Sequence, residues 1–284
     1  MDRAVLLIQC PDHKGIVAKI SNFVFGVDGN IIHSDQYSTD PEGGRFFMRV
    51  EFDFDERRLS KETLESAFAP IAKDLEATWE IHYASRPLRM GILVSRYDHC
   101  LFEVLYRLRS GDLHVEIPFV MSNHADLADL VEGYGIPFHC VPVQPGGKTE
   151  AEHEMLRLIG DRTDFLVLAR YMQILTESFM NGYTKDIINI HHSFLPSFKG
   201  ANPYRQAYER GVKLIGATAH YVTLDLDEGP IIEQLVTHVS HRDNPDDLKR
   251  KGKNLEKIAL VNAIQAHIEH RVIRYKNKTV VFEC

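Results

Sequence analysis

The sequence has 284 residues, of which 44% are hydrophobic and 26% are charged, an ordinary composition for a folded protein. This length is enough for two domains. The formal net charge of −7 argues against a nucleic-acid partner, because binding to nucleic acid usually requires a basic surface. The basic cluster at residues 249–253 follows two aspartates, so it is expected to be the exposed start of a helix.

The start of the chain and its cysteines indicate where the protein works. The first apolar run has five residues and ends before Gln9, which is too short for a signal peptide or a membrane-spanning helix. The four cysteines, Cys10, Cys100, Cys140 and Cys284, are far apart and form no Cys-x-x-Cys pair. This pattern indicates reduced thiols rather than disulfides or a zinc site. We therefore expect a cytoplasmic protein with no membrane association and no bound metal.

The first part of the chain predicts a small domain with an antiparallel sheet. The expected elements are a buried strand at 4–9, a helix from residue 17, strands at 30–39 and 45–53 joined by a turn at 40–44, a helix at 59–75 and a strand at 76–84. This order is the ferredoxin-like plan. The domain is expected to span residues 1–83, with a short linker at 84–87.

The rest of the chain, residues 88–284, predicts a second domain in which strands alternate with helices. The expected strands lie at 89–95, 115–123, 137–143, 164–170 and 186–190, and the expected helices at 99–111, 125–135 and 151–161. Such alternation indicates a doubly wound, mostly parallel, Rossmann-like sheet. In sheets of this kind the ligand lies at the carboxyl ends of the strands.

Polar residues that suit chemistry follow two of the later strands. Asn189, His191 and His192 lie at the end of the strand at 186–190. The stretch at 216–232 supplies a further strand and then an acidic turn that contains Asp225, Asp227 and Glu228.

If the two strand ends lie side by side, an amide, an imidazole and a carboxylate surround one pocket, and this set suits acyl transfer. An amide N–H such as that of Asn189 can bind a carbonyl oxygen as it becomes negative. His191 can accept or donate a proton, and Asp227 can orient its imidazole or hold a water molecule. No serine or cysteine lies in a nucleophile elbow, so water or an amine is expected to attack. The chain also contains no HExxH, Walker A or GxGxxG motif.

Each of these residues also has a simpler interpretation when it is taken alone. Asn189 can cap the segment that follows it, and Asp227 is a common turn residue. The chain has 15 histidines, so one His-His pair is expected by chance. His220, in the middle of a strand, is as compatible with a supporting role in the core as with catalysis.

The two motifs NIHHSFLPSFKGANPY, at 189–204, and GATAHYVTLDLDEGPII, at 216–232, resemble the signature of the folate-dependent formyltransferases. The resemblance covers about residues 88–284. It implies that Asn189, His191 and Asp227 are the catalytic residues. The family's folate-contacting Met-Arg-Ile-Leu stretch is matched by Met172-Gln173-Ile174-Leu175, and His192 and His220 are implied as further substrate-binding residues.

Two departures from the family pattern narrow this interpretation. The loop at 94–104 has no glycine, whereas the family members that act on glycinamide ribonucleotide bind its phosphate with a glycine-rich loop there. His192 also stands where the family has proline. These features resemble the hydrolytic branch, the formyltetrahydrofolate deformylases, in which water accepts the formyl group. The resemblance implies hydrolysis of 10-formyltetrahydrofolate to formate and tetrahydrofolate, with no cofactor beyond this folate substrate.

The front domain resembles an ACT domain, with its opening turn at residues 11–15. Asp12 and Gly15 are the candidate regulatory residues of this turn, and Gly15 is expected to permit close packing there. By resemblance the domain pairs two or more copies of the chain into a homo-oligomer. It also implies an amino-acid effector, either glycine or methionine, although a purely structural dimerisation domain fits the sequence equally well.

Three alternative functions stay open. The protein can be a formyltransferase with an amine acceptor, which an amine-dependent loss of the formyl group would reveal. It can be a non-catalytic sensor of folate or amino acids, although the intact Asn189, His191 and Asp227 argue against this. It can be an aminoacyl-tRNA formyltransferase, although the acidic balance and the lack of that family's C-terminal RNA-binding barrel argue against this.

Overall fold

The computed structural model describes residues 2–40, 43–197 and 203–283. The middle of the expected turn at 40–44 and part of the motif at 189–204 therefore lie outside the described residues. The chain divides into two compact units, the first made of Met1–Pro87 together with Glu269–Cys284 and the second of Leu88–Ile268.

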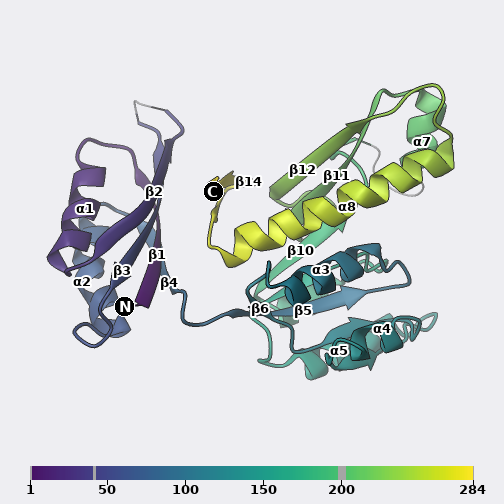
Figure 1. The fold of residues 1–284 in the computed structure, drawn as a ribbon, viewed down its shortest axis with the longest axis horizontal. Helices are drawn as coiled ribbons and strands as arrows, with labels where there is room; N and C mark the ends of the chain where they lie inside the picture. The colour runs from purple at the N-terminus through teal and green to yellow at the C-terminus, as the bar shows by residue number, and fades with distance from the viewer. Residues whose placement is uncertain (1, 41–42, 198–202, 284) are drawn as a thin grey trace. The chain divides into compact units, whose positions relative to one another are not determined.

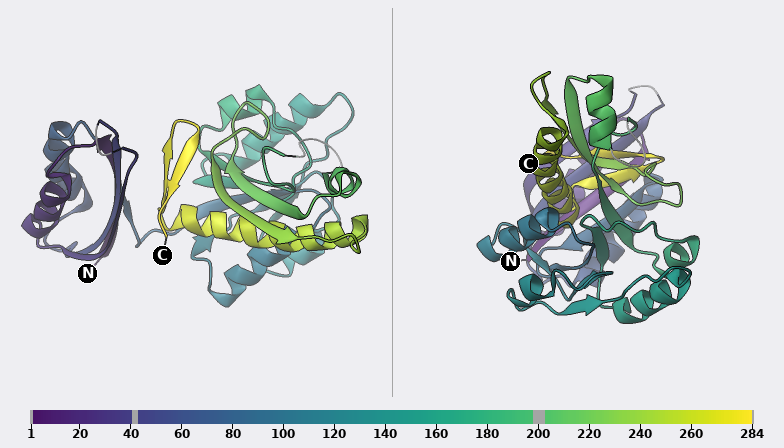
Figure 2. Two further views of the ribbon diagram at one scale, coloured as in Figure 1. Left: turned by 90° about the horizontal axis from the view of Figure 1, so that it is seen from above. Right: turned by 90° about the vertical axis from the view of Figure 1, so that its right-hand side faces the viewer.

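The first unit contains the four-stranded antiparallel sheet expected for an ACT domain. Its elements are β1 (Asp2–Pro11), α1 (Ile16–Gly26), β2 (Asn30–Ser38), β3 (Arg45–Phe54), α2 (Lys61–Asp74) and β4 (Thr78–Tyr83), and the strand order is β2-β3-β1-β4. Both helices cover one face of the sheet (Figures 1 and 2). Phe23 of α1 and Phe68 of α2 meet there with ring centroids 4.9 Å apart. The predicted ferredoxin-like domain is confirmed.

The turn between β1 and α1 differs from the prediction in the reason for its glycine. A Cβ added at Gly15 would meet no atom within 4 Å, so close packing does not require a glycine. The backbone does require one, because Gly15 has a φ of 94°, which side chains rarely tolerate. Asp12, in the same turn, accepts a hydrogen bond from the hydroxyl of Ser38. Its N–H donates to the carbonyl of Gly44 at 2.9 Å.

The second face of this sheet is covered by the C-terminal segment. The hairpin of β13 (Val272–Tyr275) and β14 (Lys278–Val281) brings apolar side chains against Phe47 and its neighbours. Buried Arg49 donates to the carbonyls of residues 269 and 270, both at 3.1 Å. The sequence placed residues 269–284 in the second domain, and in the structure these contacts group them with the first.

The second unit is built on one eight-stranded mixed sheet. Its elements are β5 (Leu88–Val94), α3 (His99–Ser110), β6 (Val115–Glu116), β7 (Val120–Ser122), α4 (Ala128–Glu132), β8 (Phe138–Cys140), α5 (Lys148–Ile159), β9 (Phe165–Leu168), α6 (Glu177–Gly182), β10 (Asp186–His191), α7 (Pro203–Arg210), β11 (Leu214–Tyr221), β12 (Ile231–His238) and α8 (Pro245–Ile268). The strand order is β12-β11-β10-β9-β5-β7-β8, with β6 beside β5. Helices α3 and α8 lie on one side of the sheet and α4 and α5 on the other (Figure 1).

The mostly parallel sheet is confirmed, with three local differences. Strands β5 to β10 run parallel, but β11 and β12 are antiparallel to their neighbours. The single strand expected at 115–123 is two strands, since Pro118 between them has no N–H for the ladder. Helix α4 covers only the middle of the range 125–135. The basic cluster at 249–253 does lie in a helix, α8, which has 24 residues. No helix among the described residues is long and apolar enough to span a membrane.

We predict that Gly91→Ala destabilises the second unit. Gly91 lies in β5, where an added Cβ would come within 2.6 to 2.9 Å of Leu166, Thr163 and Phe119. Overpacking of this kind typically costs about 1–3 kcal/mol. Urea unfolding followed by circular dichroism measures the effect. Gly147→Ala is the control, because its added Cβ would meet only contacts of 3.6 Å or longer. Equal stability of the two variants would contradict the prediction.

Candidate active site

The residues predicted from the motifs meet at one cavity of about 610 Å³ in the second unit. Each of the predicted catalytic and substrate-binding side chains lines it: Asn189, His191, Asp227, Met172, Gln173, Ile174, Leu175, His192 and His220. The cavity therefore brings together two motifs and a third segment that are far apart in the sequence.

The two motif strands meet in a different way from the one the sequence suggested. Strand β11 is antiparallel to β10, so Asn189 pairs directly with His220, the second-to-last residue of β11, and His191 at the end of β10 pairs with Thr218 further back along β11. Asp227 reaches the cavity because the loop after β11 folds back. Asp227 itself has a left-handed φ of 57°, a strained conformation for a residue with a side chain. Gly229 closes the loop, since a Cβ there would lie 1.7 Å from the carbonyl oxygen of Tyr221.

His191 and Asp227 form a hydrogen-bonded pair at the cavity wall. His191 is only 6% exposed, and its Nδ1 lies 3.2 Å from Oδ1 of Asp227. Its other nitrogen, Nε2, is buried without a hydrogen-bond partner among the described residues. Burial alone would raise the pKa of Asp227, but the hydrogen bond from His191 and the nearby imidazole of His220 hold that pKa well below its usual range. The pair thus consists of a carboxylate and an imidazole whose Nε2 is available for a proton.

His220 orients Asn189. Nδ1 of His220 lies 2.9 Å from the carbonyl oxygen of Tyr221, which can only accept, so this nitrogen carries the proton of the neutral ring. Nε2 is then an acceptor, and Nδ2 of Asn189 donates to it at 3.2 Å. One amide hydrogen of Asn189 is used in this way and the second stays available. His220 also lines the cavity, and its predicted role in substrate binding stays a prediction.

His192 is a neutral histidine in this site. Burial, together with the positive charge of Arg170 and the neighbouring His191, lowers its pKa to about 3. An imidazole with this pKa carries no charge at neutral pH, so His192 can form hydrogen bonds but contributes no cation to the cavity.

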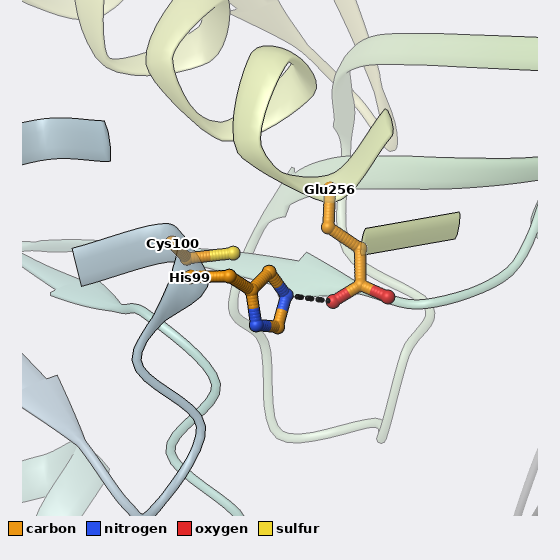
Figure 3. Close-up of side chains that lie close together, drawn as sticks. All are labelled: His99, Cys100 and Glu256. Atoms are coloured by element: carbon orange, nitrogen blue, oxygen red, sulfur yellow. Dashed lines mark hydrogen bonds and ion pairs between the residues drawn. The ribbon is translucent and has the colours of Figure 1, made fainter. Parts of the chain in front are cut away.

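On another wall of the cavity, the buried carboxylate of Glu256 in α8 contacts side chains from three other segments. It is 1% exposed and accepts hydrogen bonds from Nε2 of His99 at 2.7 Å and from the hydroxyl of Tyr204. Nε of Arg170 lies 3.4 Å from the same carboxylate. Figure 3 shows the side chain of Glu256 extending from α8 toward His99 at the start of α3. Burial opposes ionisation, but these partners lower the pKa of Glu256 to about 2.

His99, Cys100 and Glu256 also have ligand atoms within 4.8 Å of one another, a spacing that could suit a metal ion (Figure 3). The contacts favour a hydrogen-bond network instead. The Glu256 carboxylate already accepts hydrogen bonds from His99 and Tyr204, and the guanidinium of Arg170 would repel a cation beside it. Burial and the charge of Glu256 raise the pKa of Cys100 well above its usual value, so its sulfur is a neutral thiol rather than the thiolate that metals prefer.

The segment Met172–Leu175 is fixed at both ends and exposes apolar surface. The N–H of Met172 donates to Oγ of Ser95 at 3.0 Å, and the N–H of Thr176 donates to buried Glu152 at 3.0 Å. Met172 and Ile174 are 50% and 59% exposed. With the exposed leucines of the β11–β12 loop, they give the cavity an apolar wall that suits a flat ring system.

Several cavity residues were missed by the sequence analysis. They are Tyr97, His99, Arg170, Tyr204, Lys249, Lys253 and Glu256. The spacing of Lys249, Lys253 and Glu256 was a usable signal, because residues four and seven apart share one face of a helix. The basic cluster was predicted to be exposed as a whole, and the structure shows that two of its lysines line the cavity.

Comparison with known proteins identifies the family. A formyl transferase family model matches residues 88–264, and an ACT domain model matches residues 4–69. The formyltetrahydrofolate deformylase of a Synechocystis strain is 52% identical over 98% of this chain and 98% of its own. That of Bacillus subtilis is 51% identical over 99% of this chain and 94% of its own. The chain belongs to the formyltetrahydrofolate deformylase family.

Solved structures of this family and of a related one agree with the fold. A formyltetrahydrofolate deformylase from Pseudomonas syringae is 47% identical with a TM-score of 0.92, covering 100% of this chain and 95% of that one. A glycinamide ribonucleotide transformylase from Symbiobacterium toebii is 27% identical with a TM-score of 0.66, covering 71% of this chain and 97% of that one. The predicted family, an ACT domain joined to a formyltransferase domain in a formyltetrahydrofolate deformylase, is confirmed.

We predict that Glu256→Gln destabilises this deformylase-family chain in a pH-dependent way. A depressed folded-state pKa stabilises the fold above the unfolded pKa, about 4.3, and this contribution is lost as pH falls toward the folded value of about 2. The difference in pKa corresponds to about 3 kcal/mol at pH 7.

Urea unfolding at a series of pH values measures this effect. The gap between wild type and Glu256→Gln should be largest at pH 7 and should shrink below about pH 4.5. Glu209→Gln, which removes one partner of an exposed ion pair with Arg205, is the control and should change stability little. A pH-independent gap would contradict the ionised state of Glu256.

Proposed function

We propose that this protein hydrolyses 10-formyltetrahydrofolate to formate and tetrahydrofolate, with water as the formyl acceptor. The observation that carries the proposal is the unpartnered Nε2 of His191, which is buried at the cavity while Nδ1 is held by Asp227. The formyltetrahydrofolate deformylases of Synechocystis and Bacillus subtilis are 52% and 51% identical in sequence to this chain over nearly its whole length, which supports the same reaction. The apolar wall at Met172–Leu175 is a suitable surface for the pterin ring.

In the proposed first step, water attacks the formyl carbon and Nε2 of His191 takes a proton from it. Asp227 stabilises the imidazolium that forms, because it accepts the Nδ1 hydrogen and stays ionised. We also assign Asp227 the orientation of the attacking water. The formyl oxygen becomes negative and accepts a hydrogen bond from the free amide hydrogen of Asn189.

In the second step, the tetrahedral intermediate collapses and the bond between the formyl carbon and N10 breaks. The proton on Nε2 of His191 passes to N10, so tetrahydrofolate leaves as a neutral amine. The other product is formic acid, which ionises to formate. His220 acts as a positioning residue in both steps, since its hydrogen bond holds the amide of Asn189 in place.

Transfer of the formyl group to an amine is the second candidate, favoured by the likeness of the second unit to a glycinamide ribonucleotide transformylase. The loop at 94–104 supports hydrolysis rather than transfer, because it lacks the glycines of a phosphate-binding loop.

The proposed reaction releases formate and balances the pool of one-carbon folates. We propose the cytoplasm as its location, although an Arabidopsis relative is named as mitochondrial.

The first experiment incubates purified protein with 10-formyltetrahydrofolate in the absence of any amine and quantifies both products. We expect stoichiometric formate and tetrahydrofolate. Asp227→Asn should lower the rate by about 10²–10⁴-fold, the usual contribution of acid–base catalysis. Asp225→Asn makes the same chemical change at an exposed position of the same loop and should retain activity. If formate appears only after an amine is added, the protein is a transferase.

We further propose that the ACT unit assembles copies of the chain and binds glycine or methionine at the turn of Asp12 and Gly15. Strand β2 is an edge strand that exposes Ile31, Ile32 and Tyr37, an arrangement that favours pairing with another copy.

The expected result for the ACT unit is a change in deformylation rate on adding glycine or methionine. In Asp12→Ala the amino acid should change the rate less, so the ratio of rates with and without it should move toward one. The reason is that the substitution removes the carboxylate that accepts the hydrogen bond of Ser38 and holds this turn. Light scattering of the same samples reports the assembly. If neither amino acid changes the rate or binds by calorimetry, the ACT unit has a structural role alone.

A further inference from the structure

Three cations gather on one wall of the cavity, where they outnumber the acidic Asp246 and Glu256, although the chain as a whole carries a net charge of −7. Arg170, Lys249 and Lys253 all line the cavity around the ring of Tyr97. The guanidinium carbon of Arg170 lies 5.3 Å from the ring centroid, and Nζ of each lysine lies 5.9 Å from it. Three positive charges thus converge on a single aromatic side chain.

The two lysines are held together without a neutralising partner. They lie four residues apart in α8 and therefore share one face of the helix, where like charges repel each other. Neither has an ion-pair partner within the described part of the chain. The basic residues between them are paired, Arg250 with Asp247 and Lys251 with Asp243. Arg250 and Lys251 therefore have acidic partners, whereas the two lysines that line the cavity have none among the described residues.

Arg170 supplies a third, independent observation. Its side chain is 9% exposed, and its backbone has a left-handed φ of 65°. Nε of Arg170 is buried without a hydrogen-bond partner among the residues described. The nearest carboxylate, that of Glu256, lies 3.4 Å away outside hydrogen-bonding geometry and is already bonded to His99 and Tyr204. The guanidinium therefore has an unused donor in a place where unused donors are costly.

We propose that Arg170, Lys249 and Lys253 form a subsite that binds a carboxylate. An arginine fork and two lysine ammonium groups are the donors that proteins use for carboxylates. The inference rests on the proposed function, whose reaction offers two sources of a carboxylate. One is formate, released beside His191 by hydrolysis, and the other is the glutamate of the folate substrate. A subsite for formate draws the product away from the reacting centre, whereas a subsite for glutamate anchors the substrate.

The first possibility, that formate occupies the subsite, is tested by measuring the binding of formate to the intact protein, which requires no catalysis. The single proton line of formate broadens on exchange with a protein site, so a titration followed by NMR yields the dissociation constant. We expect Lys253→Gln and Lys249→Gln each to weaken binding by about tenfold or more, the usual loss for a hydrogen bond to a charged group. Lys253→Arg, which keeps the charge, should bind formate nearly as well as wild type. Arg250→Gln, on the exposed side of α8, is the matched control.

The glutamate source is tested by comparing 10-formyltetrahydrofolate with 10-formyltetrahydropteroate, which lacks the glutamate. If the glutamate occupies the subsite, the lysine variants raise KM about tenfold for the folate but not for the pteroate, and formate binding stays unchanged. If neither formate binding nor the KM ratio responds to the lysines, the proposal is overturned. Formate binding that depends on the lysines in a protein without deformylase activity would reject the proposed function and keep the subsite.

Discussion

The arrangement of the cavity depends on the buried carboxylate of Glu256. An ionised carboxyl group that is 1% exposed is stable only if several donors surround it. Two donors come from α3 and α7 and a cationic side chain comes from the loop that follows β9, so this single charge ties three segments to α8. The loop after β9 continues into Met172–Leu175, and α8 carries the cavity lysines. Satisfying one buried charge therefore positions two walls of the site.

The backbone is strained at two residues of the cavity. Arg170 and Asp227 both have positive φ, which costs about 1–3 kcal/mol for a residue with a side chain. At Asp227 the strain is offset by the hydrogen bond to His191, and at Arg170 by the proximity of Glu256. Among the residues that the structure describes, three buried nitrogens of this cavity have no hydrogen-bond partner, and they belong to His99, Arg170 and His191. Strain and unpartnered polar atoms in one place are typical of a binding site formed before its ligand arrives.

Helix α8 has a second role in the chain. Its last residue, Ile268, is followed directly by the segment that completes the first unit, where Arg49 binds the carbonyls of residues 269 and 270. The helix that carries Glu256 and the cavity lysines thus continues along the chain into the ACT unit.

The sequence by itself determined the two-part architecture and the main catalytic candidates, because helix and strand periodicity and strand-end motifs are local properties of the chain. Asn189 and His191 are two residues apart and therefore face the same side of the sheet wherever this segment forms a strand. Only the tertiary structure decided that β11 runs antiparallel, so that His220 lies opposite Asn189 and a strained loop returns Asp227 to His191. It also placed the last residues with the first unit and assembled the Glu256 network. His99 and Glu256 are 157 positions apart, and no local pattern encodes a contact over that distance.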